Sequence, residues 1–365
     1  MIVQPQFLFV QEIFNAAMAR GEELGARFSV VKEGEVVLDL WGGHADRDQT
    51  RPFDETTLTP VFSVTKALAA ILIARLVDQG RLAYDQPVAE VWPEFAAAGK
   101  GGITVEEVLS HQAGLPGFLE PMDPAAWFDW DAICAKLAAM APMWPLGTAS
   151  GYHAITYGYL AGEIFRRVDG RTMGAALAQD ISGPLGLDLF IGLPEREDAR
   201  VANLERPKSL PKFGAMNDAV RAAFLTKWAA PGGRGTEAWR RAEIPSANGH
   251  ATALSLAKLM DLMATGGGDL LSAEGVAAMA RQRIVGDDLV LPFHISWGAG
   301  VMRNQGLNVY GPGQATYGHS GWGGACALAD PDQRLGMAYV MNRQSSDLIG
   351  DPRARRLIDA VYACL

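Results

Sequence analysis

Cysteine is scarce in this 365-residue sequence, which has three, Cys134, Cys326 and Cys364, and no Cys-x-x-Cys pair. An odd number of widely spaced thiols does not build a disulfide framework, nor does it supply the clustered ligands of a structural metal site. A chain of this length still buries about three quarters of its unfolded surface. We therefore expect an ordinary apolar core, arranged in two lobes, with no metal and no organic cofactor.

Long apolar runs are also missing. The best candidate, residues 67–74, is closed off by Lys66 and Arg75, and it is much shorter than the ~18 apolar residues of a membrane span. The first residues carry no basic segment ahead of an apolar stretch, so they do not resemble a secretory signal. The sequence thus predicts a cytoplasmic protein.

Positive charge is in short supply, because 32 Lys and Arg stand against 41 Asp and Glu and leave a net charge of −9 at pH 7. Phosphate backbones and anionic lipid surfaces both bind to basic faces. We therefore expect neither nucleic acid nor a membrane as a partner, and a small molecule as the substrate. The composition carries no signal for an oligomeric state.

Several common catalytic motifs are absent. The chain has no Gly-x-Ser-x-Gly nucleophile elbow, no His-Glu-x-x-His, no Walker loop and no Gly-x-Gly-x-x-Gly. These absences argue against an ordinary α/β-hydrolase, a zinc protease with that motif, a P-loop enzyme and a dinucleotide-binding domain.

The chain does contain Ser-x-x-Lys, which occurs four times. On a helix, side chains at i and i+3 share a face, so a neutral lysine can accept the proton of the serine hydroxyl. The positive end of a helix dipole lowers the pKa of such a lysine and stabilises negative charge on the serine oxygen. The four copies are Ser29–Lys32, Ser63–Lys66, Ser209–Lys212 and Ser255–Lys258.

Only the copy at Ser63 combines an extended segment, a helix start and a long apolar helix. Ser29 and Lys32 lie in a predicted strand, where residues three apart point to opposite faces. Residues 209–212 are interrupted by a proline, and residues 255–258 have no partner motif beside them. Ser63 is therefore the candidate nucleophile, although taken alone it would also suit a helix N-cap.

The order of predicted elements indicates an α/β protein, with strand-like segments near both ends of the chain and helical patterns in the middle. The predicted strands are 27–31, 35–40, 59–62, 295–302, 325–329 and 335–341, and the predicted helices are 11–20, 63–79, 105–110, 131–140, 157–168, 172–179, 252–263 and 353–364. Residues 1–84 and 250–365 are thus predicted to form an α/β sheet lobe, and residues 85–249 a mainly helical lobe inserted into it. We expect the active site at their interface.

In these motifs the sequence resembles the serine β-lactamase and penicillin-binding-protein superfamily. The likeness is closest to its class C β-lactamase-like branch, which includes the family VIII carboxylesterases. It covers most of the chain and depends on the order and spacing of five segments, which are Phe62–Lys66, Asp85–Val88, Val108–Pro116, Tyr152–Gly162 and Gly318–Gly324. The resemblance implies a β-lactamase-like fold, with an antiparallel sheet flanked by helices and an inserted helical lobe.

The resemblance also implies roles for particular residues. Ser63 is the nucleophile, Lys66 is its helical partner, and Tyr152 is the tyrosine that shares proton transfer with the lysine. A nearby ammonium would lower the pKa of this phenol, and a strongly coupled pair titrates as a unit, so either Lys66 or Tyr152 can be the first proton acceptor. The backbone N–H groups of Ser63 and Trp322 are expected to form an oxyanion hole.

His319, Ser320 and Gly321 stand where the family has Lys-Thr-Gly on the strand that edges the site. His319 thereby replaces a fixed cation with a group that is mostly neutral near pH 7. Ala154 stands where the family has the asparagine of Tyr-x-Asn. Both departures weaken recognition of β-lactams and peptidoglycan stems. Together with the resemblance they predict a serine carboxylesterase that cleaves small uncharged esters through an acyl-enzyme on Ser63.

Other functions on the same scaffold stay open. A β-lactamase, a D-amino-acid peptidase or an acyltransferase would use the same residues, and a non-catalytic binding module would keep only the fold. Intact Ser63, Lys66 and Tyr152 count against the binding module. The remaining histidines and tryptophans are weaker candidates, which we expect to serve the structure or to point away from the site. They are His111, His153, His250, Trp41 and Trp297.

Overall fold

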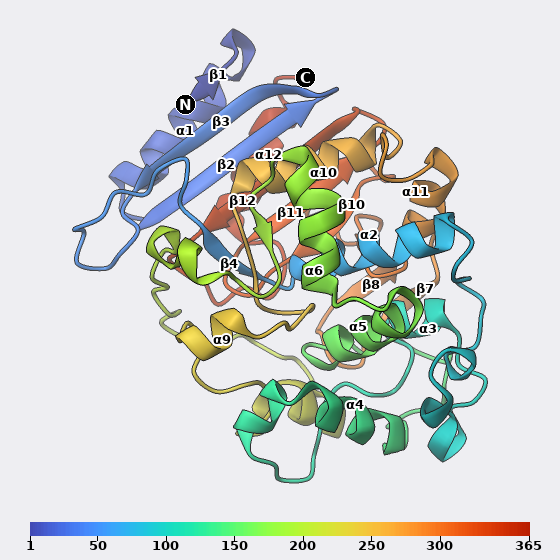
Figure 1. The fold of residues 1–365 in the computed structure, drawn as a ribbon. Coiled ribbons are helices and arrows are strands. Elements are labelled where there is room, and N and C mark those ends of the chain that lie inside the picture. The colour runs from blue at the N-terminus through green and yellow to red at the C-terminus, as the bar shows by residue number, and fades with distance from the viewer.

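A nine-stranded antiparallel sheet forms the centre of the computed structural model, which describes residues 1–365. Its strand order is β1-β3-β2-β12-β11-β10-β9-β8-β7. The N-terminal strand β2 (Gly25–Lys32) pairs on one side with β3 (Glu35–Gly43) and on the other with the C-terminal strand β12 (Leu335–Met341). Both ends of the chain are therefore built into one sheet, as Figure 1 shows.

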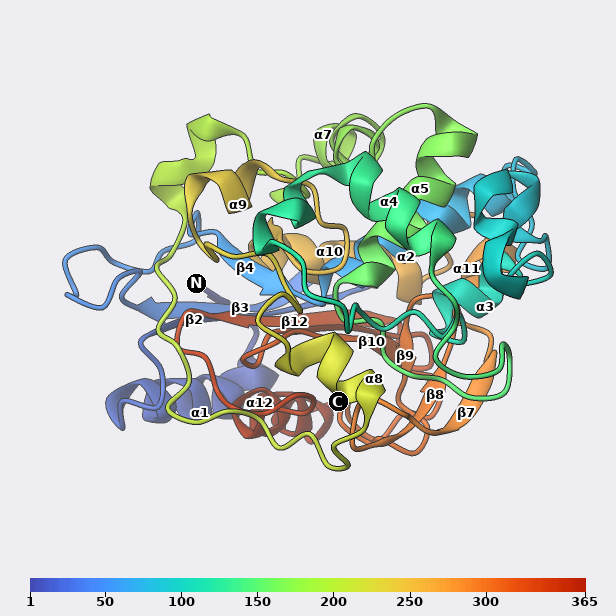
Figure 2. The same cartoon turned by 90° about the horizontal axis from the view of Figure 1, so that it is seen from below.

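Helices cover both faces of this sheet. Figure 2 shows α1 (Leu8–Ala19) and α12 (Pro352–Tyr362) on one face, and α2 (Thr65–Asp78) and α10 (Ala253–Ala264) on the other. Because both faces are covered, β12 is buried along its whole length, and its sequence is a continuous apolar run. The predicted α/β class, with an antiparallel sheet flanked by helices, is confirmed.

The remaining elements are short. The other strands are β1 (Ile2–Val3), β4 (Thr59–Phe62), β5 (Leu189–Phe190), β6 (Gly249–Ala251), β7 (Ile284–Asp287), β8 (His294–Trp297), β9 (Met302–Arg303), β10 (Tyr317–Ser320) and β11 (Cys326–Asp330). The other helices are α3 (Val105–Leu109), α4 (Trp130–Ala139), α5 (Thr156–Asp169), α6 (Met173–Leu177), α7 (Gly183–Leu185), α8 (Asp218–Val220), α9 (Glu237–Arg241) and α11 (Ala273–Ala280). Strands β4, β6 and β5 form a second, three-stranded sheet. The division into two lobes at residues 84/85 and 249/250 stays a prediction.

Local chemistry explains the elements that the sequence predicts best. The β2–β3 hairpin turns at Glu33 and Gly34, which both have positive φ (51° and 84°), as the tight turns between twisted antiparallel strands require. Helix α2 is buried nearly all round, in agreement with its apolar sequence. No helix combines the length and the apolar character needed to cross a bilayer.

One predicted strand is interrupted. Residues 295–302 form two strands, β8 and β9, because the chain turns at Gly300 (φ 84°) between them. A Cβ atom at this position would lie 2.2 Å from the Tyr157 hydroxyl and 2.8 Å from Ala70. A glycine is therefore required where the loop passes over α2 and α5. Elements β7 and α11 were not predicted, because their short sequences lack a clear period, and β10 was implied only by the family resemblance.

Gly336 in β12 lets α10 lie directly on the sheet. A Cβ atom there would be 2.2 Å from the Asp261 nitrogen and 2.3 Å from the Ala257 oxygen, both in α10. We predict that Gly336→Ala lowers the free energy of unfolding by about 2 kcal/mol or more, since the helix backbone has to move. Gly286→Ala in β7, where nothing lies within 4 Å, is the control. Equal urea midpoints for the two variants would contradict this packing.

Candidate active site

Ser63 follows a distorted end of β4. The pairing of β4 with β6 shifts register between Pro60 and Phe62, and Phe62 has φ 47°, a strained value for a bulky residue. The Thr65 hydroxyl donates to the Phe62 carbonyl oxygen at 2.5 Å and accepts from the Gly249 N–H at 2.9 Å. These contacts tie the strained turn to the neighbouring strand.

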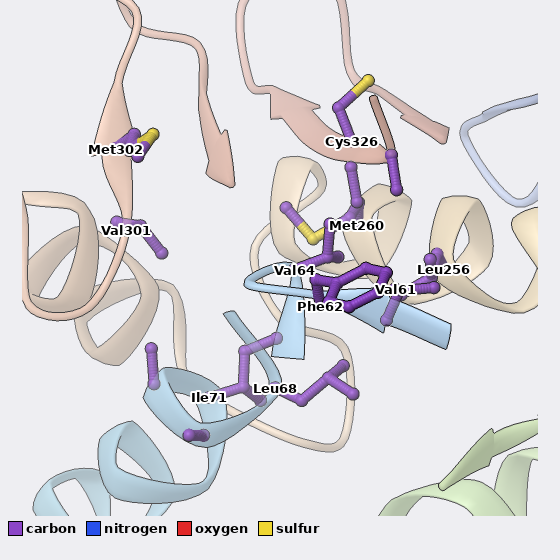
Figure 3. Packing of buried hydrophobic residues seen from close by; sticks show 14 of the residues in the cluster. Val61, Phe62, Val64, Leu68, Ile71, Leu256, Met260, Val301, Met302 and Cys326 are labelled. Atoms are coloured by element: carbon purple, nitrogen blue, oxygen red, sulfur yellow. The ribbon is translucent and has the colours of Figure 1, made fainter. Parts of the chain in front are cut away.

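Buried side chains hold this turn from several directions. Figure 3 shows Val61, Phe62 and Val64 among apolar side chains of α2, α10, β9 and β11. Because these elements come from distant parts of the sequence, the turn is positioned by the core rather than by its own propensity. Ser63 is the residue that this packed turn presents.

The helix begins two residues later than predicted. Helix α2 starts at Thr65, and the Lys66 N–H donates to the Ser63 carbonyl at 3.0 Å, so residues 63–66 form a tighter turn of 3₁₀ type. The N-cap residue is Val64, and no side chain caps the helix. The hydroxyl of Ser63 is therefore not used as a helix cap.

Lys66 lies against Ser63 in a fully buried position. Its Nζ atom is 3.3 Å from the Ser63 Oγ atom, and it donates to the carbonyl oxygens of Ala154 at 2.8 Å and Ser246 at 3.0 Å. No carboxylate pairs with this amine, and burial lowers the pKa of Lys66 well below its usual value. A neutral amine has two N–H bonds, so when the two carbonyls accept both, its lone pair is left for Ser63.

Tyr152 completes the group around Ser63. The Lys66 Nζ atom lies 4.7 Å from the centre of the Tyr152 ring. Burial raises the pKa of the Tyr152 phenol, while a hydrogen bond with Ser63 acts in the opposite direction and is the weaker effect. The expected lowering of this pKa by a nearby ammonium is therefore wrong for the resting site. Burial thus favours the uncharged form of both the phenol and the amine.

Aromatic rings and a buried carboxylate hold Tyr152 in place. Its ring stacks on Trp297 (5.9 Å between centres, 10° between planes), and His111 lies 4.9 Å away. Asp288 accepts hydrogen bonds from the N–H groups of Tyr152 (2.9 Å), Val290 (3.0 Å) and Leu291 (2.9 Å), and from the Ser150 hydroxyl (2.9 Å). Asp288 was not singled out in the sequence. An aspartate that accepts from the N–H groups two and three residues later is typical of a turn, so its bonds to residues 290 and 291 could have been predicted. No local sequence pattern indicates its bond to residue 152.

Ser63 and Tyr152 line a small apolar cavity of about 130 Å³. The polar or charged residues among its lining are Ser63, Tyr152, Arg234 and Ser320, and the others are mainly apolar. These others include Phe62, Ala154, Phe224, Leu291, Trp322, Leu348 and Ile349. The N–H groups of Ser63 and Trp322 donate to no other group of the chain. Two backbone donors are thus free beside the hydroxyl.

Three residues were predicted beside the nucleophile. His319 and Ser320 are on strand β10, and Gly321 directly follows it. Ser320 lines the cavity, and its hydroxyl is 2.9 Å from that of Tyr310. A Cβ atom at Gly321 would lie 2.2 Å from the Val61 carbonyl oxygen, so glycine lets the chain pass close to β4. His319 is fully buried behind Tyr152 and does not line the cavity. Burial, and to a lesser degree Lys66, lower the pKa of His319 to about 3, so it is neutral.

The weaker candidates have structural surroundings. His111 and His153 are buried, and the His153 N–H donates to the His111 Nδ1 atom at 3.1 Å. The His153 ring does not line the cavity of Ser63 and accepts from the Leu115 N–H at 2.9 Å. Trp297 packs in the core behind Tyr152, and Trp41 is half-buried on β3. His250 is buried in β6.

The other Ser-x-x-Lys copies do not bring a serine and a lysine together at a cavity. Ser29 is buried in β2 and donates to Asp39 at 2.6 Å. Ser255 accepts from the Asp188 N–H at 2.9 Å near the start of α10, and Ser209 is exposed. No group of three or more His, Cys, Asp or Glu side chains is placed to hold a metal ion.

A serine and a buried lysine one turn apart, beside strand β10 of an antiparallel sheet, define the class of serine hydrolases built on the β-lactamase scaffold. Residues 10–361 match the Beta-lactamase family model, and the chain belongs to this family. The predicted superfamily and β-lactamase-like fold are confirmed.

Proteins similar to this chain support a serine hydrolase. The Esterase/beta-lactamase LipL of Mycobacterium tuberculosis is 34% identical over 368 residues, which cover 94% of this chain and 83% of the relative. A penicillin-binding protein homologue from Caulobacter crescentus is 61% identical with a TM-score of 0.98, and a family VIII carboxylesterase is 41% identical with a TM-score of 0.94. In both comparisons the match covers 100% of this chain and 99% of the solved one.

Asp288 is predicted to matter for the local order of Tyr152. In Asp288→Ala, three N–H groups lose a buried acceptor, so we expect a loss of about 1–3 kcal/mol in the free energy of unfolding. We also expect faster hydrogen exchange at the amides of residues 152, 290 and 291. The control is Asp287→Ala, because the neighbouring Asp287 side chain is 93% exposed. Unchanged exchange at residue 152 would argue against this role.

Proposed function

We propose that the protein is a carboxylesterase that cleaves small esters through an acyl-enzyme on Ser63. The 3.3 Å approach of a buried lysine amine to the Ser63 hydroxyl carries this proposal, since burial favours the neutral form of the amine. Such an amine can take the hydroxyl proton, as histidine does in other serine hydrolases. The cytoplasmic location, the small-molecule substrate and the lack of nucleic-acid or membrane partners stay predictions.

In the first step, the Ser63 oxygen attacks the ester carbonyl and its proton passes to Lys66. The N–H groups of Ser63 and Trp322 donate to the carbonyl oxygen as it becomes negatively charged. When the bond to the alcohol oxygen breaks, the proton returns from Lys66 to the leaving alcohol, directly or through the Tyr152 hydroxyl. We assign the first proton acceptance to Lys66, because burial favours its neutral form and disfavours a tyrosinate at residue 152.

In the second step, water replaces the alcohol. Lys66 accepts a proton from the water, whose oxygen attacks the acyl carbonyl. The bond to the Ser63 oxygen then breaks, and that oxygen takes the proton back from Lys66. The products are a carboxylic acid and free Ser63, so the same residues serve both halves of the reaction.

The surroundings of Ser63 support an ester rather than a β-lactam or a peptide. His319 is neutral and lies behind Tyr152, so it does not supply a cation beside Ser63. Residue 154 is alanine and has no side-chain amide to hold an acylamide group. The family VIII carboxylesterase, to which this chain is similar, points by its name in the same direction, whereas the name of LipL covers both an esterase and a β-lactamase.

Removal of the Ser63 hydroxyl is the direct test. We predict that Ser63→Ala lowers kcat/KM for p-nitrophenyl butyrate by at least about 10³-fold, because no other hydroxyl is held against a neutral lysine. Ser209→Ala, at the exposed Ser-x-x-Lys copy, is the matched control and should retain full activity. Circular dichroism would show that both variants are folded. Retained ester hydrolysis in Ser63→Ala would refute the proposal, and wild-type turnover of nitrocefin that exceeds turnover of every ester would favour a β-lactamase.

The pH dependence tests the role of Lys66. The amine acts only when unprotonated, so kcat/KM should fall as the pH falls through the pKa of Lys66. Because burial lowers this pKa, the acid limb should lie well below the usual lysine value of 10.5. Lys66→Arg, whose guanidinium stays protonated, should be inactive at every pH, whereas Lys208→Arg should keep the wild-type profile. An acid limb near 10.5 would contradict a neutral Lys66.

A further inference from the structure

A second and larger cavity, of about 660 Å³, adjoins the cavity that contains Ser63. Arg234 lines both of them and so stands at their boundary. The two cavities differ in character, because the small one is mainly apolar whereas the larger one is mainly polar. Four arginines line the larger cavity, namely Arg51, Arg206, Arg234 and Arg240.

Two of these arginines are already neutralised. Arg51 pairs with Asp46 at 3.2 Å, and Arg240 pairs with Asp198 at 2.8 Å. Arg206 and Arg234 have no carboxylate within 4.0 Å and no hydrogen-bond partner in the chain, although the sequence holds 41 acidic against 32 basic residues. Burial and the charge of the nearby Arg206 both lower the pKa of Arg234. Two positive groups thus face one cavity without a counter-charge.

Aromatic rings position the Arg234 guanidinium beside the proposed nucleophile. Its central carbon lies 5.2 Å from the ring centre of Phe62 and 5.8 Å from that of Trp322. Both rings line the small cavity, and Phe62 directly precedes Ser63. Stacking on two rings fixes the guanidinium while its N–H groups stay free to donate.

The wall of the larger cavity contains a further unpaired polar group. His250 is fully buried, lines this cavity, and has no hydrogen-bond partner at either ring nitrogen. A buried polar group without a partner is uncommon in folded proteins. Burial lowers the pKa of His250 to about 4, so at neutral pH it offers one N–H donor without adding charge.

We propose that the larger cavity binds a carboxylate that the substrate carries at a distance from the scissile ester. Arg234 is its principal ligand and Arg206 its second, since a guanidinium binds a carboxylate through two parallel hydrogen bonds. The substrates of this class are half-esters of dicarboxylic acids and esters of hydroxy acids. This inference rests on the proposed esterase function and refines it, because the reacting end of the ester stays uncharged while its far end carries the acid.

Two pairs of esters test this inference. They distinguish a carboxylate on the acyl part of the substrate from one on the alcohol part. In the acyl pair, mono-4-nitrophenyl glutarate is compared with 4-nitrophenyl pentanoate. In the alcohol pair, 4-(butyryloxy)butanoate is compared with butyl butyrate. For each pair the quantity measured is the ratio of kcat/KM for the carboxylate ester to that for the neutral ester.

We expect Arg234→Gln to lower this ratio about 10- to 100-fold in one of the two pairs. The pair that responds shows whether the carboxylate belongs to the acyl or to the alcohol part of the substrate. Arg206→Gln should lower the ratio in the same pair by a smaller factor. Raising the salt concentration should slow only the carboxylate ester. Arg47→Gln, at an exposed arginine that does not line the cavity, should change nothing.

Neutral esters provide the internal control. If Arg234→Gln lowers the ratio in one pair while Arg47→Gln leaves it unchanged, the inference holds, because any loss shared by the neutral and the carboxylate ester cancels in the ratio. If the ratio is unchanged in both pairs for both variants, the inference is wrong but the esterase function stands. If the wild-type protein cleaves none of the four esters, the proposed function itself fails.

Discussion

The burial of one amine without a counter-charge is the constraint on which the site depends. Lys66 lies between two carbonyl oxygens and the rings of Tyr152 and Tyr157. A protonated amine in this place would lack the carboxylate that normally offsets the loss of hydration. The protein therefore favours the neutral amine, and this protonation state gives Ser63 a base. The buried Lys66 amine lowers folding stability, but its neutral form can act as a base.

The residues around Lys66 hold its amine in this buried position beside Ser63. Phe62 and His111 have left-handed φ values, 47° and 66°, and both lie within the group of residues around Ser63 and Tyr152. Such conformations persist only when the surrounding packing determines them. Helix α2, buried nearly all round, and Asp288, with its four hydrogen bonds, supply that packing from opposite ends of the sequence. The conformation of the site thus depends on the packing of the core.

The sequence predicts those parts that depend on local periodicity. The β2–β3 hairpin, helix α2 and strand β12 follow from apolar patterns and a glycine turn, and the pairing of Ser63 with Lys66 follows from their i, i+3 spacing. Tyr152 is 86 residues beyond Lys66, so only the family resemblance indicated that they meet. Asp288 and Arg234 escaped prediction because their roles arise from long-range contacts of loops, which no local pattern encodes. The interrupted strand at Gly300 has the same origin, since the glycine is needed for its contact with Tyr157.

The position of positive charge around Ser63 connects the two proposals. The resemblance implies a cation on the strand that edges the site, where this chain has a neutral, buried His319. Arg234 instead comes from the segment between α8 and α9 and stacks on Phe62 and Trp322. A cation at residue 319 would lie behind Tyr152, whereas Arg234 stands at the boundary between the cavity of Ser63 and the larger cavity. Positive charge is thereby moved from the strand behind Tyr152 to the boundary of the two cavities, where we propose that it selects the remote part of a substrate.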